Sequence, residues 1–441
     1  MGRTSVGSPR HMIISTIVAF AAFGSFWGVW GASVPRVQRQ ADIGDGQLGL
    51  ALLFVGAGAL PAMLLVGRAL DRWGLTVAGV VIAALGCAGV GMVLTAVSLE
   101  RLCVGLVFVG ATSGAADVAM NAVAGRAERI AGRPVITRAH GVFSSLVVLA
   151  SLATGLASAA SLPLAVPFAV VAFFSLLAGA SLLKTLPAGA TAQRHEPVPA
   201  ADPAPSTGRG IGPFLLIGAL GALGFASENA HQSWSAVFAH DELHSGAGLS
   251  AVAPAVFAGT VAITRFSVGG LKASHARTVL LAGAAAAAAG AVLIAAAPTL
   301  LVAGLGLAVA AAGTAVLFPT LLGIVSRNVD ESRRGRATSV VTTVSYLGFL
   351  VGPVYVGIWA DAVGLRGAMV AVAALAVALF ALTPVLLPLS GFGGRGPRSH
   401  VNIDQAAHHT VGASENRLSL PPRSSKLPAA PVAARTEDRT A

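Results

Sequence analysis

The sequence predicts an all-α polytopic membrane protein in which twelve transmembrane helices form two pseudo-symmetric bundles of six. Composition, the length of the apolar segments and the placement of the basic residues support this prediction. Of the 441 residues, 55% are hydrophobic and 11% are charged, whereas a soluble domain carries about 25% charged residues. This composition excludes an ordinary soluble enzyme, a disordered chain and a nucleic-acid-binding domain, and it makes lipid the expected solvent.

Twelve apolar segments have the length that a helix needs to cross a bilayer, which is about 20 residues. They do not alternate in polarity and are about twice as long as the strands of a membrane barrel, so a β-barrel is excluded. The first segment follows Arg3 and Arg10, but it is too long for the apolar part of a signal peptide, and we interpret it as a retained span. The segments are 12–34, 46–67, 75–97, 100–123, 138–160, 163–186, 212–238, 248–268, 277–297, 299–325, 337–360 and 366–389.

Two stretches lie outside the predicted membrane spans. Residues 187–210 combine five prolines with polar residues, which is typical of a flexible or extended linker. Residues 391–441 mix Gly, Pro, Ser, Arg and Ala with little periodicity, and we expect a disordered cytoplasmic tail there. With residues 1–11 as a cytoplasmic N-terminus, the linker separates two six-helix bundles, 12–186 and 211–390.

The basic residues predict the orientation. Of the 29 Lys and Arg residues, only Arg36, Arg39, Arg101 and Arg366 fall in one set of alternate loops. Because the basic loops of membrane proteins face the cytoplasm, we place both termini there. The alanine-rich composition, with more Arg than Lys, favours a bacterial source, so the expected location is the bacterial plasma (inner) membrane. This placement accounts for the net charge of +11 without a nucleic-acid partner.

The two predicted bundles repeat a feature of the sequence. A basic loop, 125–138, joins the fourth and fifth segments, and another, 327–336, joins the tenth and eleventh, at the same place in each half. Repeated halves are typical of secondary transporters, which bind substrate near the middle of the membrane between the halves.

The loop after the second segment, Gly67–Gly74, carries a recognisable spacing of residues. A glycine is followed by Asp-Arg four residues later and by a second glycine after one more residue. We expect Gly67 to allow close helix approach, Gly74 to permit a tight turn, and Asp71 with Arg72 to act at a cytoplasmic gate. This spacing resembles the signature loop of the major facilitator superfamily, whose members are membrane transporters.

The fourth segment contains an acidic residue, which is costly inside a membrane and usually functional. Asp117 and Asn121 lie one turn apart on the same helix face, and His140 begins the fifth segment. This block resembles the fucose-permease branch of the superfamily and a group of poorly characterised bacterial inner-membrane transporters. The resemblance implies that Asp117 takes up and releases a proton and that Asn121 and His140 face the translocation path. Two alternatives stay open: Asp117 could pair with Arg72 or Arg138 as a gate, and His140 could be an interfacial residue.

The resemblance extends over both halves, roughly residues 25–370. Four further stretches carry it: Trp30–Pro35, Gln47–Leu50, Glu228 with Trp234–Val237, and Tyr346–Pro353.

The seventh segment is the most polar of the twelve. It carries Glu228, Asn229, His231 and Gln232, and Glu228 lies about 24 Å along the predicted helix, past the middle of the membrane. We interpret these residues as part of a substrate or coupling site. The alternative is a polar gate on the outer side or a set of hydrogen bonds between helices.

Three further features leave alternatives open. Arg265, near the end of the eighth segment, could pair with an acidic residue, but we favour extension of its side chain to the headgroups. Pro319 and Pro353 could kink the tenth and eleventh segments. The first segment carries an aromatic stripe that consists of Phe23, Phe26, Trp27 and Trp30. This stripe could line a cavity, although we favour packing or lipid contact.

Together these features predict a secondary active transporter, not an enzyme. The sequence has no ATP-binding loop, no paired Cys or His residues with metal-ligand spacing and no sign of a cofactor. We expect proton-coupled uptake of a small polar molecule such as a sugar; the alternative is proton-driven efflux of drugs or metabolites. Its expected partners are the solute, protons and the lipid bilayer. The sequence does not indicate an oligomeric state.

Overall fold

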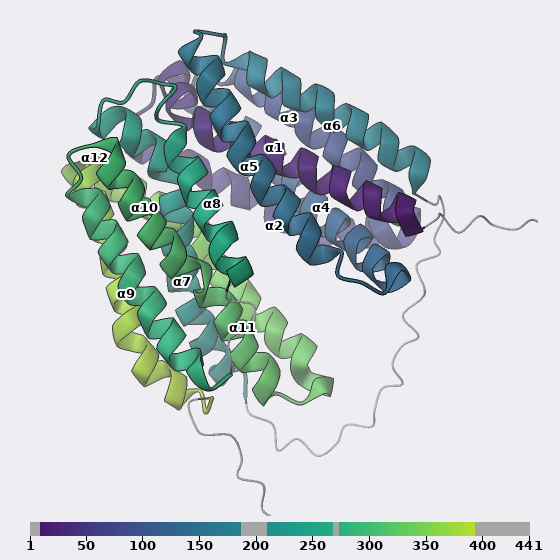
Figure 1. Ribbon diagram of the computed structural model, residues 1–441, viewed down its shortest axis with the longest axis vertical. Helices are drawn as coiled ribbons and strands as arrows, with labels where there is room; N and C mark the ends of the chain where they lie inside the picture. The colour runs from purple at the N-terminus through teal and green to yellow at the C-terminus, as the bar shows by residue number, and fades with distance from the viewer. Residues whose placement is uncertain (1–8, 187–209, 268–272, 393–441) are drawn as a thin grey trace, which may run out of the picture. The chain divides into compact units, whose positions relative to one another are not determined.

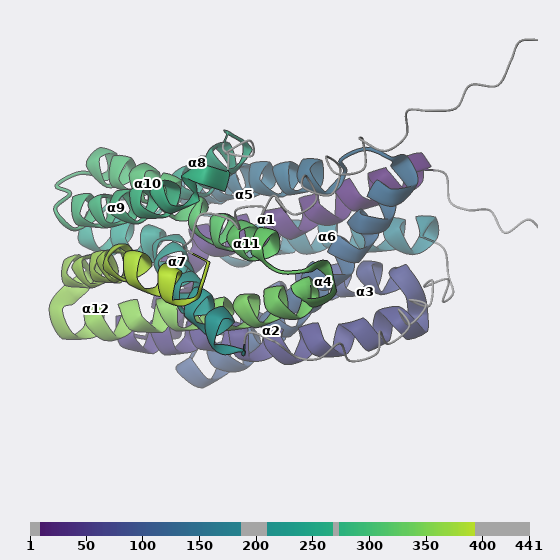
Figure 2. The same ribbon diagram turned by 90° about the horizontal axis from the view of Figure 1, so that it is seen from below.

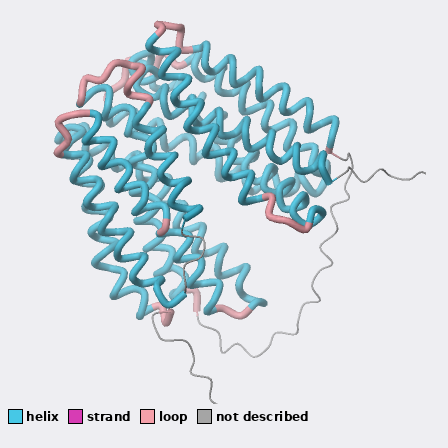
Figure 3. The backbone as a smooth tube through the Cα atoms, in the orientation of Figure 1, coloured by secondary structure: helices cyan, strands magenta, loops and turns pink. Residues whose placement is uncertain are grey.

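The computed structural model describes residues 9–186, 210–267 and 273–392 (Figure 1). Within these ranges every regular element is a helix (Figure 3). The predicted linker and tail lie outside the described residues, apart from residues 210, 391 and 392.

The first half consists of six long helices. They are α1 (Pro9–Ala41), α2 (Asp45–Trp73), α3 (Val77–Thr95), α4 (Leu99–Ala131), α5 (Ile136–Ala159) and α6 (Ala165–Thr185), with a 3-10 turn η1 (Gly74–Thr76) between α2 and α3. Gly74 ends α2 with a φ of 72°, which a glycine adopts without a steric penalty. The tight turn predicted at Gly74 is therefore present.

The second half contains more breaks. Its elements are α7 (Gly212–Val237), the π-helix η2 (Phe238–Glu242), α8 (Val252–Ser267), the 3-10 turn η3 (Ala273–His275), α9 (Ala276–Ala295), α10 (Leu300–Ala315), α11 (Leu317–Asn328) and α12 (Glu331–Leu389). The predicted tenth segment is thus two helices, and the predicted eleventh and twelfth join in α12. Gly364, with a φ of 78°, is the non-helical point that divides α12.

Nine helical stretches of the described residues are long and apolar enough to cross a membrane. Two of them, Asp45–Thr95 and Arg333–Leu389, each contain two predicted spans that meet at Gly74 and at Gly364. The shorter apolar helix Val252–Ser267 occupies the place of the eighth predicted segment. The arrangement is therefore consistent with twelve crossings.

The two halves repeat the same packing scheme. In the first half α1 packs on α5, α2 on α4 and α3 on α6; in the second half α7 packs on α12, α8 on α10 and α9 on α12. Small residues allow close approach of membrane helices, and a Cβ atom at Gly114 of α4 would lie 2.8 Å from the Ala59 carbonyl oxygen of α2. Gly290 of α9 meets Gly306 of α10 in the same way, at 2.6 Å.

The halves meet along two seams. In one, α2 packs on α12; in the other, α5 packs on α8. Figure 2 shows the two seams on opposite edges of the helical bundle, with α1 and α7 between them. We call the end of the helices that carries Arg72, Arg129 and Arg327 the basic end, and the other end, where α1 joins α2, the opposite end.

Candidate functional site

A cavity of about 400 Å³ lies between the two halves. It is lined by α1, α2, α4 and α5 of the first half and by α7, α8 and α12 of the second. A volume in this range accepts a small molecule. The polar and charged lining residues are Ser113, Asp117, His140, Ser151, Glu228, Asn229, Gln232, Ser233, Arg265 and Tyr346.

Asp117 contributes a carboxylate to the cavity from α4. The Asn121 side chain donates to Asp117 Oδ1 at 3.1 Å and to the Asp117 backbone oxygen at 2.9 Å. Asp117 forms no ion pair with the described residues, so the proposed gate pairs with Arg72 and Arg138 are absent from this structure. Asn121 itself is not among the lining residues. It contacts the Asp117 carboxylate through the one-turn spacing that the sequence shows, and its role on the path stays a prediction.

His140 faces the cavity from the first turn of α5. Its ring packs edge-on against Phe20, with centroids 4.9 Å apart, and it is exposed to the cavity. It also lies within electrostatic reach of Arg265 in the other half. His140 therefore lines the cavity near the basic end of α5.

Glu228 and Arg265 form an ion pair at the cavity wall. Arg265 Nη2 donates to Glu228 Oε1 at 2.8 Å. The carboxylate side is largely enclosed, with 11% of the Glu228 side chain exposed, whereas 45% of the Arg265 side chain is exposed. The expectation that Arg265 extends to the headgroups is therefore wrong, because a buried carboxylate within reach offers it a stronger partner than lipid does.

A proline fixes the position of Arg265. Pro319 in α11 has no backbone N–H, so the carbonyl of Ala315, four residues earlier, lacks its helical hydrogen-bond donor. Arg265 Nε approaches that carbonyl at 3.4 Å. The break between α10 and α11 thus provides the acceptor that holds the guanidinium beside Glu228.

A second proline orients the polar face of α7. Pro353 in α12 leaves the carbonyl of Phe349 without a helical donor, and Asn229 Nδ2 donates to it at 2.6 Å. Ser233 donates to Asn229 Oδ1 at 3.1 Å, and Trp234 Nε1 donates to the Pro353 carbonyl at 3.1 Å. The freed carbonyls explain why these prolines and polar residues occur together in apolar helices.

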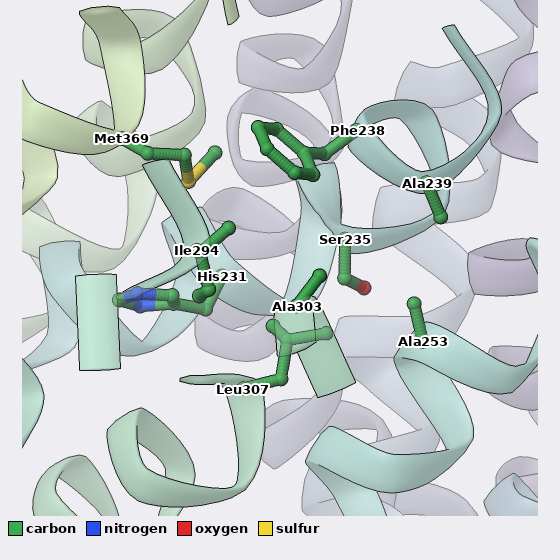
Figure 4. Close-up of a pocket in the computed structure, with 9 residues that line it drawn as sticks. All are labelled: His231, Ser235, Phe238, Ala239, Ala253, Ile294, Ala303, Leu307 and Met369. Carbon is green, nitrogen blue, oxygen red and sulfur yellow. The ribbon is translucent and has the colours of Figure 1, made fainter. Parts of the chain in front are cut away.

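His231 lies outside the central cavity, which corrects its predicted place on the path. It faces a second, very small pocket of about 10 Å³ (Figure 4). The side chain is 1% exposed, its ring stacks on Phe257 with centroids 6.0 Å apart, and Nδ1 contacts the Ser227 carbonyl at 2.7 Å. The reason is the helical period: three residues after Glu228, His231 is rotated toward α8 and α10, whereas Gln232 remains on the cavity side.

Aromatic side chains cover much of the cavity wall. Phe23 of α1 contacts Trp27 of the same helix and Phe143 of α5, and all three line the cavity. In the other half Phe225 contacts Tyr346 and Phe349, with centroids 5.4 Å and 6.1 Å apart. All four aromatic residues of the predicted α1 stripe pack in or against the hydrophobic core, as expected. Phe23, Trp27 and Trp30 also line the cavity.

The predicted gate loop lies at the basic end, away from the cavity. Asp71 and Arg72 are exposed, Asp71 forms no ion pair with the described part of the chain, and Arg72 lies 5.9 Å from the Trp73 ring. A Cβ atom at Gly67 would meet nothing within 4 Å. The close approach expected at Gly67 is therefore absent among the described residues.

At the opposite end the halves are in direct contact. A Cβ atom at Gly49 of α2 would lie 2.9 Å from the Gly357 Cα atom of α12. Arg39 of α1 is hydrogen-bonded to His240 of η2. A Cβ atom at Gly155 of α5 would lie 2.6 Å from the Gly248 carbonyl oxygen. Close backbone contacts therefore close the cavity toward the opposite end, whereas the gate loop at the basic end is free of the other half.

No group of three or more metal-ligating side chains occurs in the described ranges. The chemistry available in the cavity is therefore that of two carboxylates, one guanidinium, one imidazole, amides and hydroxyls.

The comparisons with known proteins agree with this architecture. The profile described as Major Facilitator Superfamily matches residues 15–305 and 273–415. An uncharacterized MFS-type transporter of Yersinia pestis is 27% identical over 363 residues, which cover 82% of this chain and 92% of that protein. An uncharacterized transporter of Sinorhizobium fredii is 26% identical over 355 residues, which cover 80% of this chain and 92% of that protein.

Solved structures show the same fold at low sequence identity. The D-xylose-proton symporter superposes with a TM-score of 0.68 at 14% identity, over 88% of this chain and 99% of that one. The nucleoside transporter NupG gives a TM-score of 0.68 at 13% identity, over 86% of this chain and 98% of that one.

Proposed function

The chain belongs to the Major Facilitator Superfamily, and from this premise we propose that it couples the uptake of a small polar solute to protons. It is a multi-pass membrane transporter with the fold of alternating-access carriers, and its family is not one of enzymes. The proposal concerns the coupling ion, the direction of transport and the site residues.

One observation carries the proposal: each half contributes a carboxylate to one cavity. Asp117 comes from α4, and Glu228 comes from α7. A carboxylate inside the membrane is costly unless it is paired or protonated, and it usually serves function. Two such groups facing one cavity, in a part of the chain without a metal-ligating cluster, support proton binding.

The roles of the two carboxylates differ by environment. Among the described residues, Asp117 has a hydrogen-bond donor, Asn121, and no cation partner, whereas Glu228 is paired with Arg265. We propose Asp117 as the residue that binds and releases the coupling proton. His140, Asn229 and Gln232 then face the solute.

The proposed direction, uptake, draws support from the description of a neighbouring structure. That structure is a D-xylose-proton symporter, whose description supports uptake of a small polar solute such as a sugar. The aromatic cover of the cavity favours the second candidate, which is proton-driven efflux of drugs or metabolites, because aromatic walls accept apolar compounds.

The distribution of basic residues supports the proposed orientation. We propose that the basic end faces the cytoplasm of a bacterial cell, with both termini on that side. In that orientation the loop Gly67–Gly74, with Asp71 and Arg72, contacts the other half at the basic end when the cavity opens outward. It would then act as the cytoplasmic gate.

The test uses the purified full-length protein in liposomes that enclose a pH-sensitive dye. D-xylose, D-glucose, hippurate and uridine are added outside in separate experiments, and the internal pH is followed. We expect at least one solute to acidify the interior, and we expect Asp117→Asn to abolish this acidification. Asp71→Asn, a matched carboxylate outside the cavity, should slow the flux without uncoupling it. Solute movement without proton movement, or full proton movement in Asp117→Asn, contradicts the proposal.

A further inference from the structure

We propose that the cavity selects small organic anions, and that Arg265 binds their carboxylate in place of Glu228. The proposed ligand is a monocarboxylate with an apolar or aromatic body. This inference rests on the proposed function, since it concerns the same cavity, and it narrows the solute from polar molecules in general to one charge class.

Arg265 has the geometry of a ligand-binding cation. Among the residues that line the cavity it is the one with a permanent positive charge. A guanidinium is a planar fork that matches a carboxylate through two parallel hydrogen bonds. Nearly half of the side chain, 45%, is exposed at the cavity wall, so a ligand reaches it without unfolding the helix.

The contact with Glu228 leaves part of that fork unused. One hydrogen bond joins the pair, from Nη2 to Oε1, and Nε is directed to the Ala315 carbonyl. Nη1 has no hydrogen-bond partner among the described residues. A free carboxylate can therefore engage Nη1 and Nη2 together, an arrangement that the present pair does not show.

When a ligand carboxylate displaces Glu228 from Arg265, the pairing of charges in the cavity changes. Before binding, Arg265 and Glu228 together are neutral. After binding, the ligand carboxylate neutralises Arg265, and Glu228 remains buried without a cation, which is strongly unfavourable. Glu228 is then expected to take up a proton, so that one anion and one proton bind together. The loaded cavity carries the same charge as the empty one.

The other charged or titratable groups near the pair are few. Tyr346 of α12 lies within electrostatic reach of Asp117, Glu228 and Arg265, and His140 of α5 lies within reach of Arg265. On the side of α10 and α11 the pair faces the neutral Ala315 carbonyl. Of the described residues that line the cavity, Asp117 is therefore the other carboxylate, and it supplies a second proton site.

The remaining cavity wall suits an apolar body. Phe225, Tyr346 and Phe349 form a contiguous aromatic group in the same half as Arg265. Phe23 and Trp27 are among the lining residues of the first half. A neutral sugar has no use for a permanent cation, and a cationic ligand would have to face Arg265. A carboxylate with an aromatic body satisfies both the cation and the aromatic walls.

The first experiment compares two ligands of the same shape. Hippurate and its neutral amide, hippuramide, are titrated by calorimetry into the full-length protein in lipid nanodiscs, with benzoate and 3-phenylpropionate as further probes. We expect hippurate to bind at least about tenfold more tightly than hippuramide, since a charge-assisted hydrogen bond is lost in the amide. Equal affinities, or no binding of any of the three carboxylates at millimolar concentration, would overturn the proposal.

The second experiment removes the two charges. Arg265→Gln alone leaves Glu228 buried without a cation and can prevent folding, so the principal variant is the neutral pair Glu228→Gln/Arg265→Gln. It should lose at least about tenfold in hippurate affinity. The matched control is Arg366→Gln/Glu242→Gln, which removes another arginine–glutamate pair. In this pair Arg366 Nε lies 2.6 Å from Glu242 Oε1, and neither residue lines the cavity. The hippurate affinity of this control should be unchanged. Wild-type affinity in the Glu228/Arg265 variant overturns the proposal.

The single variant Glu228→Gln tests whether the bound anion displaces Glu228 from Arg265 and causes Glu228 to take up a proton. The titration is repeated in buffers of different ionisation enthalpy, which reports the number of protons taken up with each anion. We expect about one proton in the wild type and close to none in Glu228→Gln, which should still bind hippurate because Arg265 has lost its competitor. Proton uptake that persists unchanged in Glu228→Gln contradicts the exchange.

The liposome transport assay distinguishes failure of this inference from failure of the proposed function. If D-xylose, and not hippurate, drives Asp117-dependent proton movement, the proposed function stands and the anion site is overturned. If hippurate binds through Arg265 but never moves with protons across liposomes, the anion site is supported and the proposed coupling fails.

Discussion

The hydrogen bond between Asn229 and the carbonyl of Phe349 gives a quantitative test of the role of Pro353. Asn229 is 8% exposed, and its Nδ2 atom donates to the Phe349 oxygen at 2.6 Å. That oxygen lacks a helical donor because Pro353 has no N–H. Asn229→Ala removes the side-chain donor that this carbonyl has in the structure.

Two reference values set the loss of folding free energy expected for Asn229→Ala. Interhelical hydrogen bonds in membrane proteins average about 0.6 kcal/mol, and a buried polar group left without a partner costs about 1–3 kcal/mol. We expect Asn229→Ala to lower the free energy of unfolding by about 1–2 kcal/mol. Pro353→Ala supplies a backbone N–H at the position that the helix normally uses. In that background Asn229→Ala should cost less than about 0.5 kcal/mol, because the carbonyl has regained a donor.

The assay is reversible unfolding in mixed detergent–SDS micelles, followed by far-ultraviolet circular dichroism, for the wild type, both single variants and the double variant. Ser233→Ala is the control, since its hydroxyl contacts Asn229 Oδ1 and not the freed carbonyl, and it should change stability less than Asn229→Ala does. Equal losses from Asn229→Ala in the proline and alanine backgrounds would refute the reasoning, since the proline would then have no part in the requirement for Asn229.

Three further predictions concern other parts of the molecule. Gly49→Val should prevent the contact with Gly357 and keep the opposite end open. The measurement is increased labelling, by an impermeant maleimide, of a cysteine introduced into the cavity. Gly304→Val is the control and should leave labelling unchanged, because a Cβ there meets nothing within 4 Å. His231→Ala should reduce stability by about 2–4 kcal/mol through loss of a buried ring, yet retain wild-type ligand affinity in calorimetry, and a selective loss of affinity would return His231 to the path. Asp71→Asn should lower the rate of solute exchange in liposomes with little change in affinity, and a large affinity change with an unaltered rate would contradict a gating role.

Much of the fold is readable from the sequence because membrane insertion depends on local composition. Each apolar segment satisfies its own backbone hydrogen bonds as a helix, so its existence does not depend on its neighbours. The turns follow as directly: Gly74 and Gly364 separate adjacent spans at positive φ. Pro319, which could kink the tenth segment, lies in the first turn of α11, directly after the break from α10.

The candidate site is readable only in part. Intramembrane carboxylates are rare and expensive, so Asp117 and Glu228 stand out in one sequence, and both line the cavity. The position of Arg265 is hard to predict, because a basic residue near a helix end resembles one that reaches the headgroups. The signal that points to the pair is an arginine inside one apolar helix together with a glutamate inside another. A proline adds to it, because the carbonyl four residues before the proline lacks its helical donor.

By itself the sequence determined the helical segments, the division into halves, the family and the presence of intramembrane carboxylates, since these depend on local hydropathy and local spacing. Only the tertiary structure decided which face of each helix meets the cavity. A rotation of 100° between neighbouring residues carries Gln232 to the cavity and His231 into the packed interior, and composition does not report that rotation. The pairing of Glu228 with Arg265 was likewise decided by the packing of α7 against α8, because a contact between residues 37 positions apart exists only once those helices are placed together.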